Sequence, residues 1–164
     1  MRGLGLVLVF SVPFFVGLWA SARARRSLLL EREWVQLSKE IYDRIRYSVC
    51  PAAQLLNGLS LPGLTASGWL PAFAVALGRG ADPVAVWEQY RQLTLPSPST
   101  DAAWLWFLRR LGRVGLEDQL LDCRRLWESL ESALPAVSQR LQQQAKLYLT
   151  LGAVVGALAV LILL

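Results

Sequence analysis

The last third of the chain carries one long apolar repeat that predicts a single helix. Between residues 116 and 141, apolar residues recur at spacings of three and four, as they do in a helix with one narrow apolar face. The positions are Leu116, Leu120, Cys123, Trp127, Leu130, Leu134, Val137 and Leu141. Because the repeat continues in phase across Pro135, we expect one kinked helix over about 116–146 rather than two helices. A narrow face of this kind requires a partner helix.

Two uncharged apolar stretches lie near the ends of the chain. Residues 3–22 form an uncharged run of twenty, and residues 147–164 follow Lys146 without a further charged side chain. A helix that crosses a bilayer needs about 20 apolar residues, within a range of about 17–25. We therefore predict a transmembrane helix over 1–22, with a short outer N-terminus, and a second transmembrane helix over 147–164.

The first apolar stretch also has features of a secretory signal peptide. Ala20-Ser21-Ala22 resembles a cleavage site, so an exported helical protein cleaved after Ala22 is the alternative interpretation. However, the apolar run is longer than the roughly 7–15 residues of a signal core. Arg23 and the two arginines that follow it also favour retention on the cytoplasmic side. An uncleaved anchor is the favoured interpretation.

The residues between the two stretches predict a soluble domain over 28–146 that faces the cytoplasm. A basic stretch at 23–27 adjoins the first span, Arg140 and Lys146 adjoin the second, and the outer ends carry only Arg2. Basic residues beside spans tend to stay on the cytoplasmic side, so both termini are expected outside. The chain is therefore expected to be an integral membrane protein with two spans.

Apolar repeats separated by turn residues predict the helices of this domain. The expected helices cover 28–49, 52–59, 69–77, 84–93, 102–113 and 116–146, with a loop over 60–68. The first helix has its apolar face at Leu30, Trp34, Leu37, Ile41, Ile45 and Val49. Asp82 is the expected N-cap of the helix over 84–93, and Asp101 that of the helix over 102–113. No segment has the alternation of a strand, so the fold class is all-α: a compact bundle of about six helices flanked by two transmembrane helices.

The composition excludes several kinds of active site. The chain has no histidine, which removes Ser-His-Asp and Cys-His catalysis and histidine-containing metal sites. It contains no phosphate-binding GxxxxGK[ST] loop. Cys123 lies on the apolar repeat, where a thiol packs as a small hydrophobe. We therefore predict no enzymatic activity, no cofactor, no metal and no small-molecule substrate.

An acidic cluster in the long helix leaves one enzymatic alternative open. Glu117, Asp118 and Asp122 lie near the start of that helix, where the helix dipole favours negative charge. We interpret the cluster as part of the helix start. A membrane-anchored enzyme that uses these carboxylates is the alternative.

The cations and small residues of the chain provide the candidate interaction sites. The net charge is +5, and the arginines after the first span explain much of it through contact with anionic headgroups, so no nucleic acid is expected as a partner. The candidate partner or membrane surface consists of Arg23, Arg25, Arg26, Arg109, Arg110, Arg124 and Arg125. Gly152 and Gly156 form a GxxxG motif in the second span, which lets helices pack closely against the first span or against another copy of the chain. Trp104 and Trp106 cannot both face the core of one helix, so one of them is expected to face a partner or the membrane surface.

Two segments of the C-terminal half form specific motifs. The first reads Leu-Gly-Arg-Val-Gly-Leu-Glu-Asp-Gln at 111–119, and the second reads Lys-Leu-Tyr-Leu-Thr-Leu-Gly-Ala-Val-Val-Gly at 146–156. In the N-terminal half, a basic stretch follows the first span, and Glu40-Ile41-Tyr42 and Tyr47 precede Pro51. With these motifs the chain resembles the stage III sporulation protein AB family over nearly its whole length.

The resemblance implies a function that the residue patterns alone do not indicate. It implies an endospore-forming source and an integral membrane component of the channel apparatus between mother cell and forespore. The family's domain is similar to the helical domain of type II secretion system F platform proteins, which lie against a secretion ATPase. By that analogy the chain is a non-enzymatic platform, and its partners are stage III sporulation protein AA, an ATPase, and other membrane proteins of the same complex. The membrane would be the mother-cell membrane around the forespore. A type II secretion or pilus-like inner-membrane platform outside sporulation is the alternative.

Overall fold

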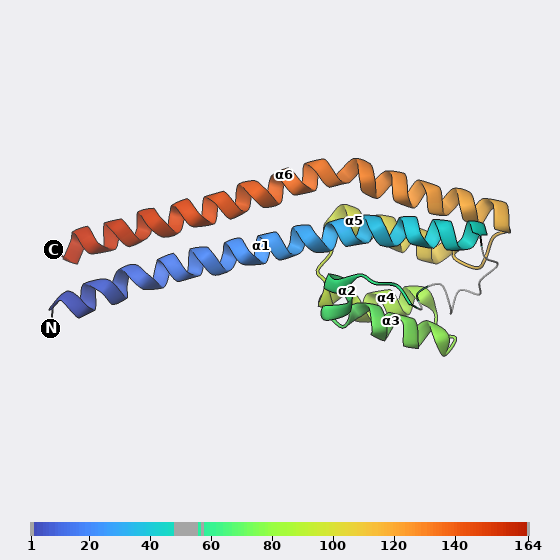
Figure 1. Cartoon of the computed structure of the whole chain (residues 1–164), viewed down its shortest axis with the longest axis horizontal. Helices are drawn as coiled ribbons and strands as arrows, with labels where there is room; N and C mark the ends of the chain where they lie inside the picture. Colours follow the sequence, from blue (N-terminus) through green and yellow to red (C-terminus); the bar gives the residue numbers. More distant parts are fainter. Residues whose placement is uncertain (1, 48–55, 57, 164) are drawn as a thin grey trace. The chain divides into compact units, whose positions relative to one another are not determined.

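The computed structural model describes residues 2–47, 56 and 58–163 (Figure 1). The side chains of residues 2–15, 156 and 159–163 lie outside this description. The helices are α1 (Arg2–Tyr47), α2 (Pro62–Ala66), α3 (Trp69–Gly78), α4 (Pro83–Tyr90), the 3₁₀ helix η2 (Arg91–Leu93), α5 (Pro98–Arg110) and α6 (Leu116–Leu163). No strand is found among the described residues, so the predicted all-α class is confirmed.

The chain divides into two compact units. The first, which we call the helix pair, comprises Met1–Leu28 and Ala136–Leu164. The second, which we call the helical unit, comprises Leu29–Pro135. Helices α1 and α6 each continue from one unit into the other, and α6 is one helix across Pro135, as the apolar repeat predicts.

Some predicted elements fall on residues that the structure does not describe. The predicted helix over 52–59 lies largely outside the described residues. Residues 2–22 and 147–163 of the two predicted spans have helical backbone, but some of their side chains lie outside the description. Within the described part of the chain, no helix is sufficiently long and apolar to span a membrane.

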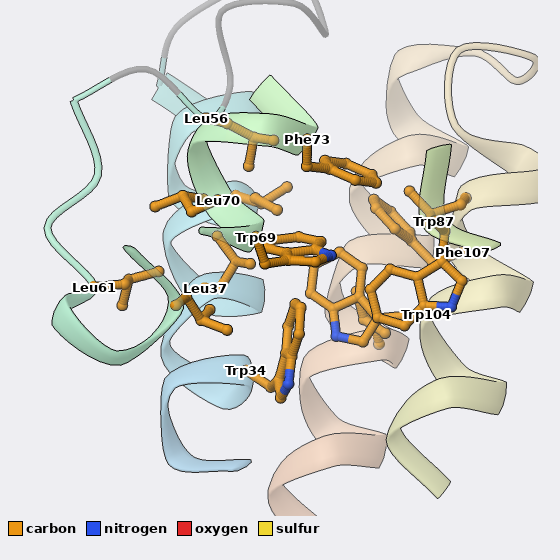
Figure 2. Close-up of a cluster of buried hydrophobic side chains, with 14 of the residues drawn as sticks. Trp34, Leu37, Leu56, Leu61, Trp69, Leu70, Phe73, Trp87, Trp104 and Phe107 are labelled. Carbon is orange, nitrogen blue, oxygen red and sulfur yellow. The ribbon is translucent and has the colours of Figure 1, made fainter. Parts of the chain in front are cut away.

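Four tryptophans form the centre of the helical unit (Figure 2). Trp34 comes from α1, Trp69 from α3, Trp87 from α4 and Trp104 from α5. The ring centroid of Trp34 lies 4.5 Å from that of Trp69 and 5.3 Å from those of the other two. The rings of Trp34 and Trp69 meet edge to face, the arrangement that the aromatic quadrupole favours. This cluster therefore joins four helices through large buried side chains.

The core face of α1 agrees with the sequence prediction. The buried apolar residues of α1 in the helical unit are Leu30, Trp34, Leu37, Ile41 and Ile45. They follow the helical repeat, because only one stripe of a helix can face a core. The expected sixth position, Val49, lies outside the described residues.

The predicted loop over 60–68 is wrong in part, because it contains the short helix α2. Pro62 occupies the first helical turn, where its missing N–H costs nothing. The free N–H groups of that turn are bound by α1: the Glu33 carboxylate accepts from the N–H of Gly63 at 2.8 Å and of Leu64 at 2.7 Å. A partner distant in sequence thus stabilises a helix too short to show a periodic pattern.

The predicted start of the helix over 102–113 is also wrong. Helix α5 begins four residues earlier, with Ser97 as the N-cap accepting from the N–H of Thr100 at 3.4 Å. Asp101 lies inside the helix and accepts hydrogen bonds from the indole N–H of Trp87 at 2.8 Å and from Arg91 at 2.7 Å. The carboxylate expected to cap α5 therefore connects it to α4 and η2. By contrast, Asp82 caps α4 as predicted.

A second carboxylate of α1 binds the start of α5. Glu31 is buried, and it accepts from the N–H of Ser97 at 2.6 Å and from the hydroxyl of Thr100 at 2.6 Å. These contacts fix the N-terminus of α5 against α1.

The buried face of α6 differs from the predicted apolar repeat. Cys123 and Leu130 are buried as predicted, whereas Leu116, the first residue of the helix, is 55% exposed. The buried residues that the repeat missed are Gln119, Asp122 and Leu126. Two of them are polar: the Gln119 side-chain oxygen accepts from the N–H of Gly112, and the Asp122 carboxylate accepts from Arg110. Apolar spacing alone could not identify them.

Candidate interaction surfaces

Five cations of the helix pair form what we call the cationic belt. They are Arg23, Arg25, Arg26, Arg140 and Lys146, and all five side chains are exposed. The first three lie on α1 directly after the apolar stretch. Lys146 lies on α6 directly before the other stretch, and Arg140 lies six residues before Lys146. Within the helix pair, α1 and α6 run side by side in opposite directions, so the belt combines cations from both helices (Figure 1).

Two grooves lie between α1 and α6 within the helix pair. The first, which we call the Arg25 groove, has a volume of about 180 Å³ and is lined by Arg25 and Lys146 among others. The second, the Arg23 groove, has a volume of about 340 Å³ and is lined by Arg23, Trp19 and Tyr148 among others. In the second groove the guanidinium of Arg23 lies over the ring of Trp19, 5.8 Å from its centroid.

A close approach of the two helices involves the candidate glycine motif. A Cβ atom at Gly17 would lie 2.8 Å from the carbonyl oxygen of Tyr148 and 3.6 Å from the Cα of Gly152. The first of these distances is too short for any side chain, so the contact requires glycine in α1. The structure therefore brings Gly152 to α1. The surroundings of Gly156 lie outside the described residues.

In the helical unit, the candidate arginine Arg110 binds a buried carboxylate. The Nε of Arg110 donates to the Asp122 carboxylate at 2.6 Å, and Asp122 is only 1% exposed. The guanidinium of Arg110 also lies over the ring of Trp106, 5.6 Å from its centroid. Trp106 is 40% exposed and Trp104 is buried, as the sequence predicts for two positions that straddle a helix.

The other candidate arginines of the helical unit remain at the surface. Arg109, Arg124 and Arg125 are exposed. Arg124 lies 3.8 Å from Glu128 one turn along α6, a surface pair that contributes little to stability. No ion pair of Arg109 or Arg125 is found in the part of the chain that the structure describes. Arg109 and Arg125 are therefore candidate cations that are available to a partner.

The surroundings of Cys123 do not favour catalysis. Burial, reinforced by the negative charge of Asp122, raises the pKa of the Cys123 thiol from 9.0 to about 12, although a hydrogen bond with Gln119 opposes this. A thiol with such a pKa is not a nucleophile at neutral pH. Over the described residues, no group of three or more Asp, Glu, Cys or His side chains could hold a metal ion.

The sequence prediction missed some residues of these surfaces. Lys146 and Arg140 were used to predict topology, yet they belong to the same cationic belt as the candidate arginines. Gly17 was not singled out, although it is the glycine of the first apolar stretch that contacts the second. A comparison of the two apolar stretches could have identified these residues, because each stretch has cations at its inner end and small residues further along.

Comparison with known protein families identifies a match over nearly the whole chain. The model of stage III sporulation protein AB (spore_III_AB) matches residues 2–164. Because this match covers nearly the whole chain, the chain belongs to the stage III sporulation protein AB family, and the resemblance inferred from its motifs is confirmed. Membership implies a role in stage III of sporulation. No curated protein and no solved structure matches the chain.

Proposed function

We propose that this member of the stage III sporulation protein AB family is a non-enzymatic membrane platform that docks a cytoplasmic ATPase. The membrane is the mother-cell membrane around the forespore, and the helical unit faces the cytoplasm. The ATPase is stage III sporulation protein AA, the partner that the family resemblance implies.

The Arg25 groove is the observation that best supports insertion of the helix pair into a membrane. The Arg25 groove has a cation from α1 on one wall and a cation from α6 on the other. Arg25 lies three residues after the first long uncharged stretch, and Lys146 immediately precedes the second. Two antiparallel spans whose inner ends lie at the same level suit a protein that is anchored twice, with its soluble part on one side.

The chemistry of the side chains supports a platform rather than an enzyme. The chain has no histidine, and the pKa of Cys123 is raised to about 12. Asp122, one of the three carboxylates of the enzymatic alternative, is buried against Arg110. Cys123 and Asp122 thus have structural roles in the helical unit.

The exposed basic residues support docking of a partner with an acidic surface. Arg109 of α5 and Arg125 of α6 are exposed cations, and Trp106, three residues before Arg109 in α5, offers a partly exposed aromatic surface. Arginine and tryptophan are enriched in protein interfaces because both combine polar contacts with a large apolar area. We place the ATPase contact on these residues.

Co-purification from sporulating cells tests the proposal. The full-length tagged protein should recover stage III sporulation protein AA, and the R109E/R125E variant should recover much less. R79E, which reverses one exposed charge after α3, is the control and should behave as wild type. Equal helix content by circular dichroism would show that the variants fold. If the wild-type protein recovers other membrane proteins of the complex but never the ATPase, the docking role is wrong.

A further inference from the structure

The acidic side chains of the chain are confined to one of its two units. All twelve Asp and Glu residues lie within 29–135, so the helix pair contains none. The cationic belt therefore has no acidic side chain of its own unit to neutralise it. Like charges so close together raise the energy of the folded protein unless anions lie beside them.

The Arg25 groove is lined by two cations of the belt, one from each helix. Its walls are Ser21, Arg25 and Leu28 on α1 and Leu141, Gln142 and Lys146 on α6. Ala24 and Ala145 lie between the walls, and both are buried. Because these two side chains are small, a hollow of about 180 Å³ opens between two cations and two neutral polar groups.

We propose that the Arg25 groove binds the headgroup phosphate of an anionic phospholipid. Arg25 and Lys146 contact the phosphate from opposite walls, and Ser21 and Gln142 donate hydrogen bonds to its oxygens or to the headgroup. The inference rests on the proposed membrane insertion of the helix pair, and it adds a defined lipid site to it.

The position of the groove favours a lipid over a soluble anion. Leu149, which also lines the groove, is the third residue of the second uncharged stretch, and Ser21 lies at the inner end of the first. A ligand here thus meets cations at one end and apolar helix surface at the other. A phospholipid, with an anionic head and apolar chains, matches both ends, whereas a free phosphate matches only one.

The Arg23 groove is less suited to the same ligand. It is larger, at about 340 Å³, but Arg23 is its single lining cation among the described residues. That cation already lies over the ring of Trp19. The two grooves of one helix pair therefore differ in their expected lipid preference.

Lipid binding to the full-length protein tests the site. Native mass spectrometry of the detergent-solubilised protein would be titrated with phosphatidylglycerol and with phosphatidylcholine of the same acyl chains. A basic residue near an anionic lipid contributes about fivefold in affinity, so R25Q/K146Q should bind phosphatidylglycerol about 30-fold more weakly. Its binding of phosphatidylcholine should not change.

The control variant is R26Q/R140Q, which removes the same charge from the same two helices. Both residues are exposed, and neither lines the Arg25 groove. This variant should keep phosphatidylglycerol affinity within about threefold, as screened surface charges do. Equal losses in the two double variants would show diffuse attraction and overturn the site. Competition by soluble glycerol phosphate at the same concentrations as the lipid would also overturn it.

A separate measurement distinguishes failure of this site from failure of the membrane proposal. Membranes containing the wild-type protein would be washed with alkaline carbonate, which removes peripheral proteins. Retention of the wild-type protein without a preference for phosphatidylglycerol would refute the lipid site and leave the membrane platform intact. Release of the wild-type protein would refute the platform itself, and the lipid site with it.

Discussion

The ion pair between Arg110 and Asp122 is asymmetric in its exposure. The side chain of Arg110 is 43% exposed, whereas that of Asp122 is 1% exposed. Loss of the carboxylate leaves an arginine that water can solvate, but loss of the arginine leaves a buried carboxylate without its cation. The two partners are therefore not equivalent for stability.

We predict that R110M destabilises the protein more than D122N does. A buried charged group that loses its hydrogen-bond partner costs about 2 kcal/mol, and D122N should cost about 1 kcal/mol. Thermal unfolding of the full-length protein in detergent would measure both. R109M, at the neighbouring exposed position, should change stability by less than about 0.5 kcal/mol. A larger effect of D122N than of R110M would contradict the assignment of Asp122 as the costly partner.

The buried thiol of Cys123 gives a prediction for reactivity and pH. Its pKa is about 12 in the folded protein, compared with 9.0 in the absence of burial. The folded state therefore binds the proton more tightly, and stability should fall as pH rises from about 9 towards 12. In a C50S background, iodoacetamide at pH 8 should label Cys123 only after unfolding, as mass spectrometry would show. Rapid labelling of the native protein would mean that the thiol is accessible.

At the scale of elements, α1 supplies the acceptors that hold two other helices. Glu31 binds the start of α5, and Glu33 binds the start of α2. Carboxylates at helix N-termini satisfy free N–H groups and interact favourably with the helix dipole. α1 therefore organises the helical unit through hydrogen bonds as well as through its apolar face.

We predict that E31A destabilises the helical unit by about 2 kcal/mol, because it leaves the Ser97 N–H and the Thr100 hydroxyl without their acceptor. The unfolding midpoint of the full-length protein should fall by about 4–8 °C. E31Q retains one oxygen and should show a smaller loss. E88A, which removes an exposed carboxylate from α4, is the control and should leave the midpoint nearly unchanged. A midpoint for E31A equal to that of E88A would contradict the role of Glu31.

The contact at Gly17 gives a prediction for the helix pair. In G17V the added Cβ would collide with the carbonyl oxygen of Tyr148, so α1 and α6 must separate locally. Spin labels at the exposed positions Leu18 and Leu151, in a C50S/C123S background, would report this as a longer distance in pulsed electron paramagnetic resonance. A22V places the same valine side chain at an exposed position of α1 and should leave the distance unchanged. An unchanged distance in G17V would show that the close approach is absent.

The elements also show which parts of the fold the sequence could reveal. The core face of α1 was predictable because every buried apolar position in it obeys the helical repeat. The start of α5 was not predictable, because both Ser97, which precedes Pro98, and Asp101 are residues that favour an N-cap. Only the tertiary contact of Asp101 with Trp87 shows that Asp101 lies inside the helix. The polar part of the buried face of α6 depends on partners such as Arg110 and the N–H of Gly112, which spacing within one helix cannot show.

At the scale of the whole molecule, the candidate surfaces were predictable as charge patterns but not as sites. The sequence identified the arginines of both units and the glycines of the second stretch. It could not show that Arg110 is used internally, that Gly152 meets Gly17, or that Lys146 shares a groove with Arg25. Each of these depends on which helices lie side by side, and that is a tertiary property.

The segregation of charge along the chain leads to a prediction about topology. Cations beside both apolar stretches should hold the helical unit in the cytoplasm. Alkaline phosphatase, which is active only outside the cytoplasm, should therefore be active when fused to either terminus. It should be inactive when inserted after Gly80, in the exposed connection between α3 and α4.

Removal of the belt arginines tests whether these charges cause the orientation. In R23Q/R25Q/R26Q the cytoplasmic bias beside the first apolar stretch is lost, so the insertion after Gly80 should gain phosphatase activity in a fraction of the molecules. R109Q/R124Q/R125Q removes an equal charge from the helical unit, far from that stretch in sequence, and should keep the insertion inactive. If both variants behave alike, net charge rather than the cationic belt sets the orientation. If phosphatase is active after Gly80 in the wild-type protein, the helical unit faces outward and could not meet a cytoplasmic ATPase.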